Sequence, residues 1–252
     1  MYKDLRAFLG RHARSALERP FGRFLYSTQA YSQEGEDLVL RRLLENRASG
    51  IYVDIGAHHP YRFSNTALLY RRGWRGINVD ARPGSMAAFT RERPRDVNLE
   101  LGVGERLGSM TYFMFKEAAL NTFDIAVARA REKDGWPRAG QCEVECRPLS
   151  KVIDQSLPKL AADTVDLLSI DVEGLDLEVL RSNDWSRHAP SVVVVEIPDC
   201  SLEDCLRSEV AGYLASVGYA ATAKLCQSVI FQRVHESVPG GAGRQATKGA
   251  PT

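Results

Sequence analysis

The sequence lacks the features that mark membrane-spanning, disulfide-rich and strongly basic proteins. No apolar run approaches the roughly 18–20 residues of a membrane span. No apolar stretch follows the N-terminal charges, as it would in a signal peptide. The five cysteines are scattered, and neither Cys142 with Cys146 nor Cys200 with Cys205 has the two-residue spacing of a zinc knuckle. These absences predict a cytoplasmic protein without a disulfide scaffold.

An excess of charge of one sign is also missing. The 252 residues include 33 Lys and Arg against 32 Asp and Glu, which leaves a formal net charge of +1. A protein that binds nucleic acid by bulk electrostatic attraction carries a large basic excess, so we expect no nucleic-acid partner. What is present, 44% hydrophobic and 26% charged residues, is typical of a globular protein that folds around its own core.

The two ends of the chain differ in composition from the middle. Within residues 1–30, six basic and two acidic side chains leave a charge of +4, and apolar residues recur at near-helical spacing. This pattern favours a basic helical extension docked on the domain, and peripheral contact of residues 1–25 with an anionic membrane is the alternative. Residues 236–252 are rich in Gly, Pro, Ser and Thr and predict a disordered tail. One domain is expected between them, over residues 31–235.

The middle of the chain alternates between strand-like and helix-like segments. Strands are expected at residues 51–55, 76–81, 97–104, 165–172 and 191–197, with a final hairpin at 219–225 and 227–234. Helices are expected at 66–72, from 83 onward, at 176–185 and at 201–217. The alternation predicts an α/β fold with a parallel sheet and helices on both faces.

Residues 105–150 interrupt this alternation. Strands are expected there at 110–115 and 142–146, and the stretch between them, 116–140, is expected to be irregular and polar. We interpret the segment as an inserted flap that contributes to substrate recognition.

Acidic side chains stand at the ends of four expected strands. They are Asp54, Asp80, the pair Asp171 and Glu173, and Glu196. Each one alone is also explained as a helix cap or a turn residue. Carboxylates are costly to bury together unless they serve a ligand or a proton, and parallel sheets bind ligands beyond the carboxyl ends of their strands. The set therefore predicts a ligand site at that edge of the sheet.

The turn after the first strand favours one kind of ligand. Its single glycine, Gly56, allows the backbone to approach a ligand closely, but the pyrophosphate of a dinucleotide needs a turn with several glycines. Asp80 follows Gly56 at a distance close to the roughly 20 residues expected for an acid that binds ribose hydroxyls. Asp54 is suited to a ligand ammonium group. A ribose, an ammonium group and no phosphates together describe S-adenosyl-L-methionine, which we expect as the cofactor.

Several motifs resemble the FkbM family of S-adenosylmethionine-dependent methyltransferases. They are SQEGED at 32–37, VDIGAHHP at 53–60, SNT at 64–66, GWRGINVDARP at 73–83 and SIDVEGLDLEVL at 169–180. The resemblance implies a class I methyltransferase (Rossmann-like) fold, with a seven-stranded, mostly parallel sheet, a C-terminal antiparallel hairpin and helices on both faces. It also implies methyl transfer to a hydroxyl, and the implied acceptor is a sugar, a polysaccharide or a natural product.

The resemblance assigns cofactor-binding roles to seven residues. The methionine side of the cofactor should be lined by Asp54, Gly56 and Ala57, and the ribose side by Asp80 and Ala81. The segment before the first strand should return to the pocket with Gln33 and Glu36. The sequence departs from the family pattern where His58 replaces the more usual asparagine, followed by His59. The two histidines either alter the hydrogen bonding of the pocket or satisfy a polar turn, and either is a candidate base.

Asp171 and Glu173 are the candidate catalytic residues. Because methyl transfer to a hydroxyl is an in-line displacement, alignment provides most of the rate and a general base assists. Asp171 and Glu173 are two positions apart, so both side chains lie on one face of the sheet if the expected strand continues through them. They are suited to share a proton, to bind the substrate, or to hold a divalent ion with Glu196, although nothing in the sequence demands a metal and none is assigned. Glu173 is alternatively a cap for the helix that follows.

Two other functions remain open at this point. A nicotinamide-dependent oxidoreductase would have a related fold, but the single-glycine turn disfavours it. A non-catalytic module that retains the fold is the other alternative, and the run of acids at the strand ends disfavours it.

Overall fold

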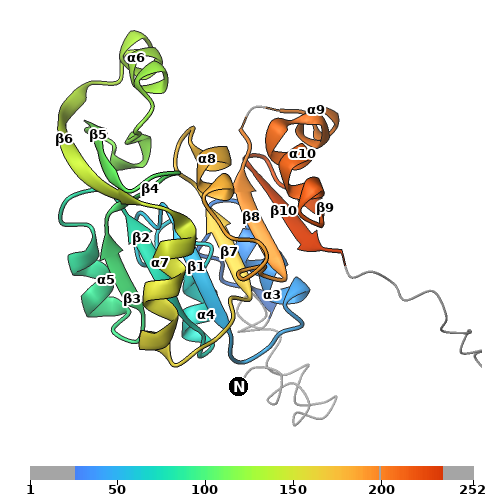
Figure 1. Cartoon of the computed structure of the whole chain (residues 1–252). Helices are drawn as coiled ribbons and strands as arrows, with labels where there is room; N and C mark the ends of the chain where they lie inside the picture. The colour runs from blue at the N-terminus through green and yellow to red at the C-terminus, as the bar shows by residue number, and fades with distance from the viewer. Residues whose placement is uncertain (1–25, 199, 235–252) are drawn as a thin grey trace, which may run out of the picture.

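The computed structural model describes residues 26–198 and 200–234, so the predictions for residues 1–25 and 236–252 lie outside the described part of the chain. Its main sheet has seven strands in the order β3-β2-β1-β7-β8-β10-β9 (Figure 1). β10 runs antiparallel to both of its neighbours, and the other pairs are parallel. The predicted class I methyltransferase architecture, with its C-terminal antiparallel hairpin, is therefore confirmed.

The strands of the main sheet are short and mostly buried. In chain order they are β1 (Ile51–Ile55), β2 (Arg75–Asp80), β3 (Val97–Glu100), β7 (Leu167–Ile170), β8 (Val192–Glu196), β9 (Tyr219–Lys224) and β10 (Ser228–Arg233). Val193 and Val195 of β8 belong to one hydrophobic cluster, whereas Val192 and Val194 belong to another on the opposite face. The continuous apolar run of this strand is thus explained by burial on both sides.

Helices cover both faces of this sheet (Figure 1). The cluster that contains Val193 includes residues of α7 (Leu149–Ser156), η2 (Leu157–Leu160), α8 (Asp176–Arg181), α9 (Leu202–Arg207) and α10 (Glu209–Ser216). The cluster on the opposite face includes residues of α3 (Glu36–Leu43) and α4 (Ala67–Arg71). α5 (Met86–Glu92) joins β2 to β3.

The segment over residues 105–150, called the insertion below, forms most of a second, three-stranded sheet. Its strands β5 (Gly108–Phe115) and β6 (Arg138–Arg147) are antiparallel, and the two-residue β4 (Gly102–Val103) pairs with β6. η1 (Ala118–Leu120) and α6 (Ile125–Lys133) lie between β5 and β6. Figure 1 shows α6 at the far end of the insertion, above the main sheet.

Three expectations about individual elements were wrong. The strand expected at 97–104 divides into β3 and β4, which belong to different sheets. The stretch 116–140 is not irregular, because the Asp124 carboxylate accepts hydrogen bonds from the N–H groups of Ala126 and Val127 and starts α6. The helix expected at 201–217 is two helices, because Ser208 has an extended backbone and its hydroxyl caps α10.

The remaining boundaries shift by a few residues. The helix expected from Pro83 begins at Met86, and the one expected at 176–185 ends at Arg181. A disulfide joins Cys200 to Cys205, which the sequence analysis did not expect.

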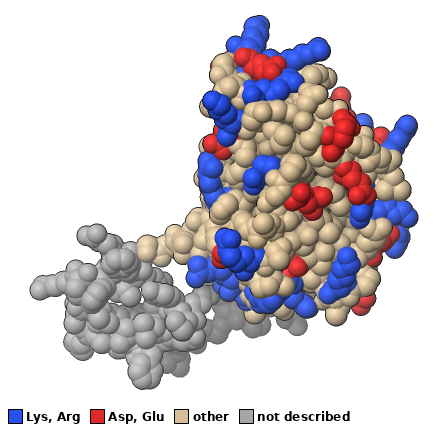
Figure 2. All heavy atoms as spheres, turned by 90° about the vertical axis from the view of Figure 1, so that its left-hand side faces the viewer, with Lys and Arg blue, Asp and Glu red and all other residues tan. Residues whose placement is uncertain are grey.

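The surface seen from the side of the insertion mixes both signs of charge. In Figure 2, Lys and Arg side chains are interspersed with Asp and Glu over this face, as the balanced composition predicts. Within residues 26–198 and 200–234, no helix has the length and apolar character needed to cross a membrane.

Candidate active site

The parallel register brings the ends of four strands to one edge of the main sheet. Ile55 ends β1 and is paired with Val79 of β2 on one side and with Ile170 of β7 on the other. Ile170 is in turn paired with Val195 of β8. The residues that follow these four stand in one row at the edge: Gly56, Asp80, Asp171 and Glu196.

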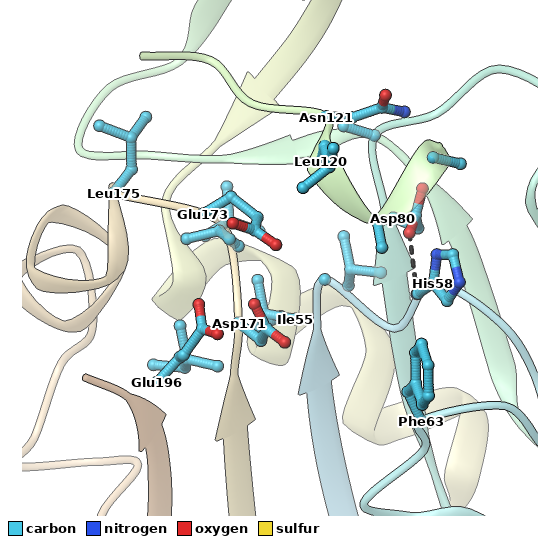
Figure 3. Close-up of a pocket in the computed structure, with 18 of the residues that line it drawn as sticks. Ile55, His58, Phe63, Asp80, Leu120, Asn121, Asp171, Glu173, Leu175 and Glu196 are labelled. Carbon is cyan, nitrogen blue, oxygen red and sulfur yellow. Dashed lines mark hydrogen bonds between the residues drawn. The ribbon is translucent and has the colours of Figure 1, made fainter. Parts of the chain in front are cut away.

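A cavity of about 370 Å³ lies along this row (Figure 3). Seven of the nine candidate site residues line it: Gln33, Glu36, Gly56, Asp80, Ala81, Asp171 and Glu173. Asp54 and Ala57 are buried outside the lining, and Ala57 packs against Met86 and Phe89. Figure 3 shows Asp171, Glu173 and Glu196 on one side of the end of β1 and Asp80 on the other. The structure therefore brings most of the predicted residues together, and their individual roles stay predictions.

Asp80 is held in the cavity wall by backbone donors from two turns. Its Oδ2 accepts a hydrogen bond from the N–H of His58 at 2.9 Å, and its Oδ1 accepts one from the N–H of Arg82 at 2.8 Å. The residue is 8% exposed. Because a carboxylate offers about four lone-pair positions, Asp80 retains about two for the hydroxyls of a ligand.

Gly56 is required by contact within the protein. It has a φ of +81°, and a Cβ at this position would lie 1.7 Å from the backbone oxygen of Asp171. The N–H groups of Gly56 and Ala57 both donate to the backbone oxygen of Val79, at 2.9 and 3.0 Å. The sequence alone suggests that this glycine serves the close approach of a ligand, whereas the structure explains it by the packing of β1 against the end of β7. These two N–H groups are also engaged, so they are not available to a pyrophosphate.

Asp54 belongs to a buried polar network beside the cavity. Its Oδ2 accepts from the hydroxyl of Thr66 at 2.6 Å, and the Thr66 oxygen accepts from Nη1 of Arg93 at 2.8 Å. Arg93 is fully buried and also binds the Ser64 hydroxyl and the backbone oxygen of Pro60. Burial raises the pKa of Asp54, and the Thr66 hydroxyl and the Arg93 charge oppose that rise. The network therefore fixes the loop after β1, which contributes residues to the cavity.

The two histidines of this loop differ in their surroundings. Nδ1 of His59 accepts hydrogen bonds from the N–H groups of Tyr61 and Arg62, both at 3.0 Å. His59 therefore satisfies the backbone donors of a polar turn, which is one of the two alternatives for the histidines. His58 lines the cavity, and its ring stacks near that of Phe63, with 6.3 Å between the ring centroids. Burial lowers the pKa of His58, which favours the neutral form of its imidazole.

Asp171, Glu173 and Glu196 form an acidic trio at the other side of the cavity. Each offers an oxygen, and these oxygens all lie within 4.8 Å of one another. Desolvation at the cavity floor, followed by the charges of Glu196 and Glu173, raises the pKa of Asp171 well above its usual range. Desolvation also raises the pKa of Glu196, to which Asp171 is hydrogen-bonded. Asp171 and Glu196 therefore retain a proton at a higher pH than isolated carboxyl groups do.

The trio has the oxygen ligands that a divalent cation prefers. No metal is expected from the sequence, and this expectation stays a prediction. The same oxygens are also suited to accept hydrogen bonds from several hydroxyl groups of one substrate.

Glu173 does not cap the helix that follows it. α8 begins at Asp176, whose own carboxylate accepts from the N–H groups of Val172 and Gly174 at 3.3 and 3.4 Å. Glu173 instead forms an ion pair with Arg131 of α6. The capping alternative is therefore wrong, and a residue of the insertion contacts the acidic trio.

The turn of the β9–β10 hairpin closes another side of the cavity. Gln227 and Ser228 line it, and the sequence analysis missed both. The N–H of Gln227 donates to Glu34, and the Ser228 hydroxyl donates to Glu36, each at 3.0 Å. Because β10 lies beside β8 in the sheet, the strand order alone would have predicted that this turn reaches the edge where the ligand site lies.

Comparison with known families decides the identity of the fold. A family model described as "Methyltransferase FkbM domain" matches residues 54–219, which is more than half of the chain. The chain belongs to the FkbM methyltransferase family. Its cofactor is therefore S-adenosyl-L-methionine, as the sequence predicted. The cavity of this FkbM protein fits that group, because Asp80 offers free acceptor positions and the Gly56–Ala57 turn offers no N–H groups for phosphates.

Solved structures of other methyltransferases are similar to this FkbM chain at low identity. The FkbM methyltransferase of Methylobacillus flagellatus KT is 15% identical with a TM-score of 0.44, and the match covers 88% of this chain and 50% of that one. A TehB-like S-adenosylmethionine-dependent methyltransferase of Corynebacterium glutamicum is 12% identical with a TM-score of 0.38, and the match covers 88% of this chain and 98% of that one. A precorrin-6y C5,15-methyltransferase of Geobacter metallireducens is 12% identical with a TM-score of 0.40, and the match covers 82% of this chain and 92% of that one.

The present chain thus spans half the length of the Methylobacillus protein. A comparison with curated protein sequences found no match.

Proposed function

We propose that this methyltransferase transfers the methyl group of S-adenosylmethionine to a hydroxyl of a polyhydroxylated acceptor: a sugar, a polysaccharide or a natural product. The observation that supports the proposal is the acidic trio, which lines the same cavity as Asp80. A site for a hydroxyl nucleophile needs acceptors for its O–H and a group that takes its proton, and three adjacent carboxyl groups offer both.

The bound cofactor supplies an electrophilic methyl group on a sulfonium. When bound, it would release this methyl group to the hydroxyl oxygen of the acceptor and keep the electron pair of the broken bond on sulfur. The proton of the hydroxyl passes to the carboxyl pair of Asp171 and Glu196. Glu173 accepts a hydrogen bond from the acceptor and orients it. This orientation assists the transfer, because alignment of the reacting atoms provides most of the rate.

The cofactor-binding residues occupy the remaining lining of the cavity. Asp80 and Ala81 are assigned to the ribose side, and Gly56 to the methionine side. Gln33 lies just before α3, and Glu36 is the first residue of that helix. His58 is the alternative base, since it lines the cavity and burial favours the neutral form of its ring.

The experiment that tests the function uses S-adenosylmethionine with an isotope-labelled methyl group and the whole chain. The acceptor panel contains free sugars, oligosaccharides, lipid-linked glycans, polyhydroxylated natural products, amines and RNA. We expect label on a hydroxyl oxygen, identified by mass spectrometry, and calorimetric binding of S-adenosylhomocysteine but not of NAD. Label on nitrogen, carbon or RNA alone would contradict the proposal, and binding of S-adenosylhomocysteine with no labelled acceptor would favour the non-catalytic module.

Membership in a methyltransferase family argues against the oxidoreductase alternative. A cytoplasmic location, the absence of a nucleic-acid partner and membrane contact through residues 1–25 remain predictions. The last concerns residues outside the described part of the chain.

A further inference from the structure

A cation from the insertion reaches the acidic trio. Nη2 of Arg131 on α6 donates to the carboxylate of Glu173, and Nη1 donates to the backbone oxygen of Leu120, a residue of the cavity wall. The side chains of Arg131 and Glu173 are only 16% and 24% exposed. One partly buried guanidinium therefore joins the insertion helix, the cavity wall and the loop that follows β7.

A second contact from the insertion holds the backbone of the same loop. The Thr122 hydroxyl donates to the backbone oxygen of Glu173 at 2.8 Å. Glu173 has a φ of 58°, in the left-handed region that non-glycine residues adopt only at a cost in free energy. The insertion thus contacts both the side chain and the backbone of Glu173.

The ion pair divides the trio into two parts. Among residues 26–198 and 200–234, Glu173 is the member of the trio that forms a salt bridge. Asp171 and Glu196 are hydrogen-bonded to each other, and Asp176 of α8 adds a further negative charge near them. Because three carboxylates this close repel one another, a cation beside one member decides which of them stays ionised.

We propose that Arg131 is a positioning residue for methyl transfer, which keeps Glu173 as an oriented anion for the acceptor and leaves the Asp171–Glu196 pair to receive the hydroxyl proton. This inference rests on the function proposed above. It gives the insertion a defined part in the reaction, because the residue that arranges the carboxyl groups of the core comes from outside the main sheet.

The first test follows ionisation and needs no acceptor. Side-chain carboxyl ¹³C signals are titrated in the whole chain, and Glu173→Gln assigns the Glu173 signal. In Arg131→Met we expect the midpoint of Glu173 to rise by about one pH unit or more, since the guanidinium opposes the effect of burial. Arg131→Lys should restore most of the midpoint. The matched control is Arg129→Met, an exposed arginine on the same helix for which no ion pair occurs among the described residues.

An unchanged Glu173 midpoint in Arg131→Met would overturn the inference. A matched variant, Thr122→Val, removes the backbone contact while it retains the ion pair, and its Glu173 midpoint should stay near the wild-type value. Retained affinity for S-adenosylhomocysteine and a retained melting temperature show that each variant is folded.

The second test measures transfer to the acceptor found for the wild type. Arg131→Met should lower kcat about tenfold or more and displace the pH profile, with little change in the affinity for S-adenosylhomocysteine, and Arg131→Lys should recover most of kcat. Wild-type turnover in Arg131→Met would overturn the inference even if the midpoint shifts. Failure of the proposed function would appear in the wild type itself, as no label on any hydroxyl, whereas failure of the inference alone appears only in the variants.

Discussion

Asp54 and Asp80 lie near the ends of the adjacent strands β1 and β2, yet their surroundings differ. Asp54 binds the Thr66 hydroxyl within the Arg93 network, whereas Asp80 binds two backbone N–H groups and lines the cavity. At the scale of single residues, the neighbours of a carboxylate therefore decide what it does more than its position at a strand end.

Replacement of Asp80 tests this difference. Asp80→Ala should weaken binding of S-adenosylhomocysteine by about 1–3 kcal/mol, because the proposed hydrogen bonds to the ribose would be lost. Isothermal titration calorimetry measures the change. Asp54→Asn is the comparison variant, and its affinity should change less because its carboxyl lies outside the cavity lining. Unchanged affinity in Asp80→Ala would mean that the ribose lies elsewhere.

Glu173→Gln should separate turnover from cofactor binding. Loss of a charged hydrogen-bond acceptor for the substrate hydroxyl should lower kcat about ten- to hundredfold. The affinity for S-adenosylhomocysteine should stay within about twofold, measured by calorimetry on the same preparation. Equal losses in both quantities would assign Glu173 to cofactor binding.

The carboxyl pair should set the acidic limb of the pH profile. Desolvation and mutual repulsion raise the pKa of Asp171 and of Glu196, and the pair must be ionised to accept a proton. Activity should therefore fall as the pH decreases through this raised range, above the range of ordinary carboxyl groups. In Asp171→Asn that limb should disappear from the plot of kcat/KM against pH, together with most of the activity. An unchanged limb would favour His58 as the base.

At the scale of secondary-structure elements, the sequence predicted the main sheet well and the insertion less well. Strands such as Val192–Glu196 are short apolar runs rich in β-branched residues, so their existence and end points follow from local pattern. α6 was missed because its nine residues expose most of their surface and bury only Ala128, which leaves no apolar period to detect. Its Asp124 cap was the available signal.

The candidate site shows the same division between local and distant information. The acids could be predicted because each lies in the sequence within three residues of the end of its strand. The contact of Arg131 on α6 with Glu173 in the loop after β7 joins residues 42 positions apart and leaves no local pattern. The reason for Gly56 was also out of reach, since it depends on how closely β7 packs beside β1.

Ser208 provides a test of the broken helix. Its hydroxyl accepts from the N–H of Ala211 at 3.2 Å and starts α10. Ser208→Ala should lower the free energy of unfolding by about 1 kcal/mol, as the loss of an N-cap does, and urea denaturation measures it. Ser208→Asp keeps a capping oxygen and should retain most of the stability. No change in Ser208→Ala would indicate one continuous helix instead of α9 and α10.

For the whole molecule, acids buried beside the cavity connect function with stability. Asp176 is 7% exposed, and desolvation raises its pKa to about 6, although the N–H groups of Val172 and Gly174 oppose the rise. A carboxyl group with a raised pKa in the folded state stabilises the fold only while it is protonated. Its contribution is therefore present at low pH and is lost as the pH rises.

The pH dependence of unfolding tests this contribution. Between the unfolded pKa of about 3.9 and the folded value of about 6, the folded state holds a proton that the unfolded state has released, so stability should fall by about 2–3 kcal/mol as the pH rises. Asp176→Asn should remove that part of the slope in urea denaturation at pH 4 to 7. The exposed Asp134→Asn should leave the slope unchanged. Equal slopes in the wild type and Asp176→Asn would contradict the prediction.

The link between the start of α3 and the last hairpin has a consequence for biosynthesis. Glu34 and Glu36 receive their hydrogen bonds from residues 193 and 192 positions later. A nascent chain on the ribosome cannot form these hydrogen bonds until Gln227 and Ser228 have emerged, so we expect cofactor binding only after translation of nearly the whole domain. Ribosome-bound chains that stop before Gln227 should fail to retain labelled S-adenosylhomocysteine, while chains extended well past Arg233 should retain it.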